Sequence, residues 1–368
     1  MIEMTSLTPD NRATTVRECS TETCVTLPHG RGSDVGLGVD EVNSICIVRL
    51  SAIGDVLMLV PMVRSLQAKF PNAKITWIIS RPAYDCVEGM SGVDFIVLDK
   101  PKNIIDYARF WLKMRAYQFD VLLAPQASFR ANLLYPLIRA TRKIGYDDNR
   151  ANDGHRYFVK EQIDTANEHT LDGFMRFATT LGATPVYEWN MPLTDDDSAW
   201  ASAHCPSETP VLLINPCASK PERTWSTSGY IEVIKQLKAK MAIAVVLIGG
   251  PGPADRAMAD AIKSEVDVID YVGKTKPRQL MALIEKATLV LCPDTGPSHM
   301  AAAVGTPVVA LHAVTNPEIS GPYTFRQYVV NAYPDNQPWG SQMHGVNAMD
   351  KITVEAVVDK VIEVLSSL

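Results

Sequence analysis

An aspartate that could act as a base follows the first apolar segment of the chain. Residues 45–50 read as a strand, residues 49–57 have the sequence RLSAIGDVL, and Asp55 opens the helix expected over residues 55–70. A carboxylate in the first turn of a helix is favoured by capping and by the helix dipole, so Asp55 could be a cap alone. The end of a parallel strand also faces the ligand side of its sheet. Asp55 is therefore also a candidate general base, and Gly54 beside it permits close approach by a ligand.

A second polar turn follows an apolar segment in the last third of the chain. Residues 292–299 read CPDTGPSH, and the alanine-rich helix that they open ends at Gly305. The first turn of a helix presents unpaired N–H groups and the positive end of the dipole, so it can bind an anion. Asp294 and Thr295 could simply cap this helix. The small turn beside His299 favours instead a site for a nucleotide diphosphate.

A third stretch carries two cations. Residues 215–225 read NPCASKPERTW and follow the strand expected over residues 211–215. Lys220 and Arg223 could belong to a solvated loop, or they could neutralise a diphosphate leaving group at the end of the strand.

The elements that must position these residues form two alternating series. Apolar strand-like segments occur at residues 45–50, 75–79, 95–98 and 121–124, and again at 211–215, 242–248, 288–292 and 307–311. Helical segments separate them, which is typical of parallel sheets covered on both faces. Residues 183–210 are rich in Pro, Asp, Ser and Thr and read as a linker. The sequence thus predicts an α/β chain of two doubly wound units, with a ligand cleft between them at the carboxyl ends of the strands.

The predicted domain boundaries follow from this alternation. We expect one domain at residues 41–200, a second at 201–350 and an amphipathic C-terminal helix at 351–368. Residues 1–40 carry three basic and six acidic residues and show no helix or strand period, so we expect a disordered extension.

Composition excludes several classes of protein. The chain has 368 residues, 46% of them hydrophobic, which suits two globular domains. Its 35 basic and 41 acidic residues provide no general polycation for nucleic acid. It has no apolar run of membrane-spanning length and no secretory signal, and its seven cysteines include no C-x-x-C pair. With no paired histidine motif, a bound metal is not expected, and the cytosol is the natural compartment.

The three motifs together support a family resemblance, and two of them are its most specific parts. RLSAIGDVL at residues 49–57 and PDTGPSHMAAAVGTPVVAL at residues 293–311 resemble those of glycosyltransferase family 9. These are heptosyltransferases that transfer heptose from ADP-heptose to the Kdo sugars of the lipopolysaccharide inner core. The resemblance runs from about residue 45 to the C-terminus. It implies a GT-B fold of two Rossmann-like domains, with the acceptor on the N-terminal one and the nucleotide sugar on the C-terminal one. It also implies an inverting, metal-independent reaction without a cofactor.

The resemblance also implies roles for individual residues. Asp55 matches the base, and Ser51 and Gly54 belong to the acceptor loop. The donor-binding turn is matched by Asp294, Thr295, Gly296, Pro297 and His299. The family often has lysine two residues before the tryptophan of the third motif, whereas this chain has Arg223 there and Lys220 nearby, so either cation could meet the diphosphate. Asp255 is the best match to an acidic residue that often meets the ribose.

A basic segment bears on the acceptor. Residues 100–160 contain twelve basic and five acidic residues, in a chain whose net charge is −6. This excess could be an ordinary solvated surface, or a basic rim for the phosphates and carboxylates of a lipid A acceptor. We expect as partners an ADP-sugar donor, a lipid A/Kdo-type glycolipid acceptor and the cytoplasmic face of the inner membrane, and no nucleic acid.

Two other functions stay open on the sequence. A GT-B nucleotide-sugar epimerase would share the two-domain cleft but would turn over without an acceptor. A non-catalytic nucleotide-sugar-binding module would bind the donor without turnover, although Asp55 beside intact donor motifs argues against it.

Overall fold

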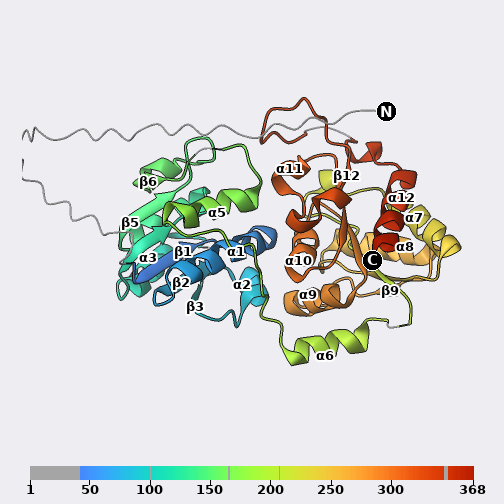
Figure 1. The fold of residues 1–368 in the computed structure, drawn as a ribbon, viewed down its shortest axis with the longest axis horizontal. Helices are drawn as coiled ribbons and strands as arrows, with labels where there is room; N and C mark the ends of the chain where they lie inside the picture. Colours follow the sequence, from blue (N-terminus) through green and yellow to red (C-terminus); the bar gives the residue numbers. More distant parts are fainter. Residues whose placement is uncertain (1–41, 100, 165, 207, 344–346) are drawn as a thin grey trace, which may run out of the picture. The chain divides into compact units, whose positions relative to one another are not determined.

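Two sheets of six parallel strands each organise the chain (Figure 1). The computed structural model describes residues 42–368, except 100, 165, 207 and 344–346, and all of these belong to one compact unit. The strand orders are β3-β2-β1-β4-β5-β6 and β12-β11-β10-β7-β8-β9. The direction of the strand order therefore reverses between β1 and β4 in the first sheet and between β7 and β10 in the second, as in doubly wound nucleotide-binding folds. The predicted fold class is confirmed.

We call the elements from β1 to α5 the N-terminal lobe. They are β1 (Ser44–Val48), α1 (Ile53–Lys69), β2 (Lys74–Ile79), α2 (Arg81–Val87), β3 (Val93–Val97), α3 (Ile104–Met114), β4 (Phe119–Leu123), α4 (Phe129–Asn132), β5 (Ala140–Gly145), β6 (Glu161–Gln162) and α5 (Thr170–Thr180). Residues of β1 alternate between the two faces: Ile45 and Ile47 pack with α1 and α5, whereas Cys46 and Val48 pack with α3.

The elements from β7 to α12 form the C-terminal lobe, and α6 (Asp195–His204) precedes them. They are β7 (Val211–Ile214), α7 (Thr227–Lys240), β8 (Ala244–Leu247), α8 (Pro253–Glu265), β9 (Ile269–Asp270), α9 (Pro277–Lys286), β10 (Leu289–Pro293), α10 (Gly296–Val304), β11 (Val308–His312), α11 (Pro317–Ser320), β12 (Val330–Asn331) and α12 (Val354–Ser367). The expected C-terminal helix is α12, which packs against α7.

Helix α1 is buried on more sides than its sequence predicts, because it packs on α5 and also on α10 of the other lobe. It contains Pro61, which has no N–H to donate to the carbonyl of Leu57 one turn earlier. The indole N–H of Trp189 donates to this carbonyl at 2.9 Å. The Leu57 carbonyl is therefore hydrogen-bonded despite Pro61, by a residue that lies 132 positions further along the chain.

Several elements were not predicted. Strand β5 has the sequence ATRKIG, which is too polar to be identified as an apolar run. Residues 183–210 were predicted to be a linker, but they contain α6, which begins with Thr194 and Asp197 in a capping box. The predicted disordered extension at residues 1–40 lies outside the described residues. Among the described helices, none is long and apolar enough to cross a membrane.

Candidate functional site

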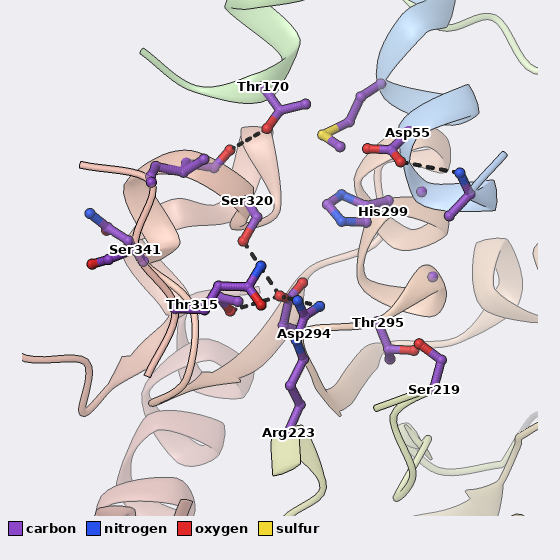
Figure 2. A pocket seen from close by; sticks show the side chains of 18 residues that line it. Asp55, Thr170, Ser219, Arg223, Asp294, Thr295, His299, Thr315, Ser320 and Ser341 are labelled. Carbon is purple, nitrogen blue, oxygen red and sulfur yellow. Dashed lines mark hydrogen bonds and ion pairs between the residues drawn. The ribbon is translucent and has the colours of Figure 1, made fainter. Parts of the chain in front are cut away.

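The loops at the two switch points face a common cavity of about 400 Å³ (Figure 2). The loop after β1 contributes Asp55, the loop after β7 contributes Arg223, and the turn after β10 contributes Asp294. Its lining residues are Ala52, Gly54, Asp55, Met58, Thr170, Ser219, Arg223, Asp294, Thr295, Gly296, His299, Thr315, Asn316, Ile319, Ser320, Gly340, Ser341 and Gln342. The three motifs therefore meet because each follows a strand that borders a reversal of strand order.

Asp55 is held by one of its two carboxylate oxygens. Oδ2 accepts the backbone N–H of Ala52 at 3.1 Å and forms an ion pair with Arg49. Arg49 is itself fixed, because it donates to the carbonyl of Pro125 after β4 and its guanidinium lies over the Phe174 ring. Asp55 is thus both the predicted cap of α1 and a residue of the cavity wall, with its Oδ1 outside these interactions.

The two acceptor-loop residues lie in different surroundings. Gly54 lines the cavity, and a side chain there would meet the ring of His299, with the Cβ only 2.4 Å from Cδ2. Its small size therefore allows the histidine, rather than a ligand alone, to approach. Ser51 does not line this cavity but a neighbouring one, together with Gln126 and Phe129.

His299 lies between the aspartates of the two lobes (Figure 2). Its side chain is almost fully buried, and Nδ1 has no hydrogen-bond partner among the described residues. Burial lowers the pKa of His299, although the nearby Asp294 and Asp55 oppose that shift. The ring is therefore neutral at neutral pH. It lines the cavity, but its unpartnered Nδ1 is itself buried.

Asp294 is the buried carboxylate of the site. Its Oδ2 accepts a hydrogen bond from the hydroxyl of Thr315 at 2.7 Å and lies 3.0 Å from Nη1 of Arg223. Burial acts to raise the pKa of Asp294, but His312, Arg223 and His299 together with the Thr315 hydroxyl hold it below its ordinary value. The turn after β10 thus carries a permanent negative charge that is paired with a cation.

The two predicted cations differ in position. Arg223 lines the cavity and is largely buried against Asp294, whereas Lys220 lies outside the lining and donates to Gln342 at 3.2 Å. Gln342 is itself a lining residue. Lys220 therefore contacts a residue of the cavity wall without lining the cavity itself.

The N-terminus of α10 opens on the cavity. Thr295 is the N-cap residue without a side-chain cap, and a Cβ on Gly296 would have nothing within 4 Å. Both residues line the cavity, whereas Pro297 does not. The helix ends at Gly305 with φ +80°, as predicted. The start of α10 therefore borders open space in which an anion can bind, although Pro297 has no N–H and the N–H of Ser298 donates to the carbonyl of Thr295.

Asp255 lies away from the lining residues. Its Oδ1 accepts the N–H of Gly250 at 3.0 Å and so orders the glycine-rich turn before α8. A role for Asp255 at the ribose stays a prediction.

Sequence reasoning did not single out several lining residues. Thr170 at the start of α5 donates to the carbonyl of Ile319 at 2.9 Å and thereby joins the lobes. Thr315 and Ser320 surround Asp294 from the segment after β11. The dipeptide Asn316-Pro317 after a strand was the available signal, since it marks a turn at the ligand side of the sheet.

Comparison with known proteins agrees with this arrangement. The family model described as glycosyltransferase family 9 (heptosyltransferase) matches residues 107–344. The lipopolysaccharide core heptosyltransferase OpsX of Haemophilus influenzae is 34% identical over 331 residues, which cover 86% of this chain and 95% of the relative. The chain belongs to glycosyltransferase family 9. The loop that carries Asp55 precedes the residues that the family model matches.

Solved structures support the fold of this family 9 glycosyltransferase. A glycosyltransferase family 9 protein from Veillonella parvula has a TM-score of 0.76 at 20% identity, covering 90% of this chain and 99% of that one. The heptosyltransferase WaaC of E. coli, solved with ADP, has a TM-score of 0.68 at 18% identity, covering 87% and 99%. At these identities the comparison concerns the fold, which is that of the GT-B heptosyltransferases.

Proposed function

We propose that this glycosyltransferase moves a heptose from ADP-heptose to the Kdo-containing inner core of lipopolysaccharide, with inversion at the anomeric carbon and without a metal ion. The observation that carries the proposal is that Asp55 and the N-terminus of α10 face one cavity from opposite lobes. A base and an anion site on opposite sides of a bound sugar suit a displacement reaction. The names of the relatives, a lipopolysaccharide core heptosyltransferase and an ADP-bound heptosyltransferase, support the substrate classes.

The donor would bind on the C-terminal lobe. Its diphosphate would lie at the start of α10, near Thr295 and Gly296, with Arg223 or Lys220 as the neutralising cation. His299 would form part of the cavity wall against the bound donor. As the bond between the anomeric carbon and the diphosphate oxygen breaks, negative charge grows on the leaving group, and these groups stabilise it.

The acceptor hydroxyl would be activated by Asp55. The hydroxyl oxygen forms the new bond to the anomeric carbon on the face opposite the leaving group, and its proton passes to the free Oδ1 of Asp55. A positioned base contributes roughly 10²–10⁴-fold to the rate. Arg49 and the N–H of Ala52 hold Oδ2 and so direct Oδ1.

The acceptor is a glycolipid, so we place its encounter with the enzyme at the cytoplasmic face of the inner membrane. The twelve basic residues of residues 100–160 belong to the N-terminal lobe, the lobe that carries Asp55. Anionic lipids and the phosphates of lipid A attract such a surface.

A product assay tests the proposal. The chain is incubated with ADP-heptose and heptose-deficient lipopolysaccharide, and ADP release and the mass of the glycolipid are followed. We expect ADP release that depends on the acceptor and a product heavier by one heptose. Release that proceeds equally without acceptor would contradict transfer and favour hydrolysis, and conversion of the donor to another ADP-sugar without net ADP release would favour an epimerase.

A further inference from the structure

Helix α3 of the N-terminal lobe exposes large apolar side chains to solvent. Four of them have high exposed fractions: Ile104 84%, Ile105 57%, Trp111 44% and Leu112 57%. Phe110 and Met114 of the same helix are buried against the sheet. Helix α3 thus has one apolar face in the core and another in solvent.

The exposed residues form a continuous stripe. At about 100° per residue, the four side chains and Ala108 span a sector of roughly 120°, away from the side that carries Phe110 and Met114. Arg109 and Lys113 lie between the two apolar sectors. A helix with a solvent-facing apolar stripe edged by cations has the composition of an interfacial membrane helix.

Basic groups surround the stripe. Lys102, Arg109 and Lys113 line a groove of about 500 Å³ beside the helix, together with Asp99 and Asp106. Arg109 pairs with Asp106 at 3.6 Å, and the Arg115 guanidinium lies 5.1 Å from the centre of the Trp111 ring. Over residues 102–115 there are four basic residues and one acidic residue, Asp106. This charge is complementary to an anionic surface, and each cation can meet a lipid phosphate.

The helix also lies near the acceptor loop. Tyr107 of α3 donates to the carbonyl of Arg130 at 3.4 Å, and the neighbouring residue Phe129 is 63% exposed. Phe129 and Arg130 line the cavity that also contains Ser51, four residues before Asp55. The segment that α3 contacts through Tyr107 therefore shares a cavity with Ser51 of the loop that carries the proposed base.

We propose that α3 docks on an anionic phospholipid bilayer, with its apolar stripe in the boundary between headgroups and acyl chains and its cations on the lipid phosphates. The inference deepens the proposed function, because it names the surface by which the enzyme would reach a membrane-anchored acceptor. Vesicle binding tests it separately, since binding requires no heptose transfer.

The experiment is vesicle flotation of the full-length chain. Vesicles of phosphatidylethanolamine with phosphatidylglycerol are compared with phosphatidylcholine alone, at low and high salt. We expect preferential binding to the anionic vesicles that weakens with salt. Trp111→Glu/Leu112→Glu and, separately, Arg109→Glu/Lys113→Glu should each reduce binding by about tenfold or more.

Matched controls lie on the C-terminal lobe. Ile269→Glu changes another exposed apolar residue, and Lys240→Glu/Lys263→Glu reverses two other exposed lysines, so both should float like the unmodified chain. Unchanged ADP binding would show that each α3 variant is folded.

Three results would overturn the inference. The first is that the unmodified chain shows no preference for anionic vesicles. The second is that the α3 variants and the control variants bind vesicles equally. The third is that Trp111→Glu/Leu112→Glu converts a dimer to a monomer in ultracentrifugation, which would make the stripe an interface between copies. Vesicle binding without heptose transfer would leave the inference standing and would count against the proposed function instead.

Discussion

At the scale of single residues, the site depends on how Asp55 is held. Arg49 and Ala52 both bind Oδ2, and Arg49 is anchored in turn by the carbonyl of Pro125 and by Phe174. Arg49 lies outside the lining of the main cavity, so we assign it a positioning role rather than a catalytic one.

Replacement of Arg49 should therefore affect turnover more than binding. We expect Arg49→Met to lower kcat by about 10–100-fold, because a misdirected base costs rate without changing donor contacts. The Kd for ADP should stay within about twofold, and Arg49→Lys should restore part of kcat. Arg142→Met, which removes a different arginine–carboxylate pair of the same lobe, is the control. An equal loss of ADP affinity in Arg49→Met would contradict a positioning role.

The hydroxyl of Thr315 should contribute to donor binding through Asp294. Thr315→Val removes a 2.7 Å hydrogen bond to the carboxylate that pairs with Arg223. We expect ADP to bind about 2–10-fold more weakly in calorimetry, the effect of losing one hydrogen bond. Thr306→Val removes a comparable buried hydroxyl that donates to Ile284, and it should reduce stability without changing ADP affinity. Matching ADP affinities for the two variants would refute the assignment.

At the scale of elements, α1 connects the fold to the site. It begins at the loop that carries Asp55, contains Pro61 and packs on helices of both lobes. The indole of Trp189 replaces the hydrogen bond that Pro61 cannot make. The Trp189–Leu57 hydrogen bond therefore attaches α1 to the segment that precedes α6.

A double-mutant cycle tests this replacement. Trp189→Phe leaves the buried Leu57 carbonyl unsatisfied and should lower the free energy of unfolding by about 1–3 kcal/mol. In Pro61→Ala the backbone N–H of residue 61 can donate to that carbonyl, so Trp189→Phe should cost less in this background. Urea unfolding of the four proteins measures the coupling. Additive effects would show that the two residues do not share the Leu57 carbonyl.

Much of the fold and part of the site could be predicted from the sequence. The apolar strands, Asp55, Asp294, Thr295 and Gly296 were identified because buried runs and short polar turns are local signals. Thr170 and Thr315 were not, because their place depends on which strand ends become neighbours. The pairing of Arg223 with Asp294 could not be predicted either, because the two residues lie 71 positions apart in the chain.

At the scale of the whole molecule, polar contacts join the lobes beside the cavity. Nδ1 of His169 accepts the N–H of Leu171 at 3.1 Å, so the neutral ring carries its proton on Nε2, which donates to the carbonyl of Gly321 at 2.9 Å. Tyr323 donates to Asp172 of α5 at 2.7 Å. The start of α5 therefore ties the N-terminal lobe to the segment that encloses Asp294.

His169 should make stability depend on pH. Burial lowers the pKa of His169 from 6.5 to about 3. Between these values the unfolded chain binds a proton that the folded chain does not, so the free energy of unfolding falls as pH drops below about 6.5. This group alone should cost about 1 kcal/mol at pH 5.5 relative to pH 7.5. Urea unfolding at both pH values should show that the free energy of unfolding falls less in His169→Gln than in the unmodified chain. An equal fall in the two proteins would contradict a neutral His169 ring.

The proposed reaction depends on Asp55 as the group that removes the acceptor proton. The most direct measurement compares transfer and ADP binding in Asp55→Asn, whose side chain can still accept from Ala52 and cap α1. Asp197→Asn changes the equivalent cap of α6 and serves as the matched control. We expect Asp55→Asn to lose about 10²–10⁴-fold in kcat while its Kd for ADP is unchanged, and the control to keep its turnover. Turnover near that of the unmodified enzyme in Asp55→Asn would contradict the claim.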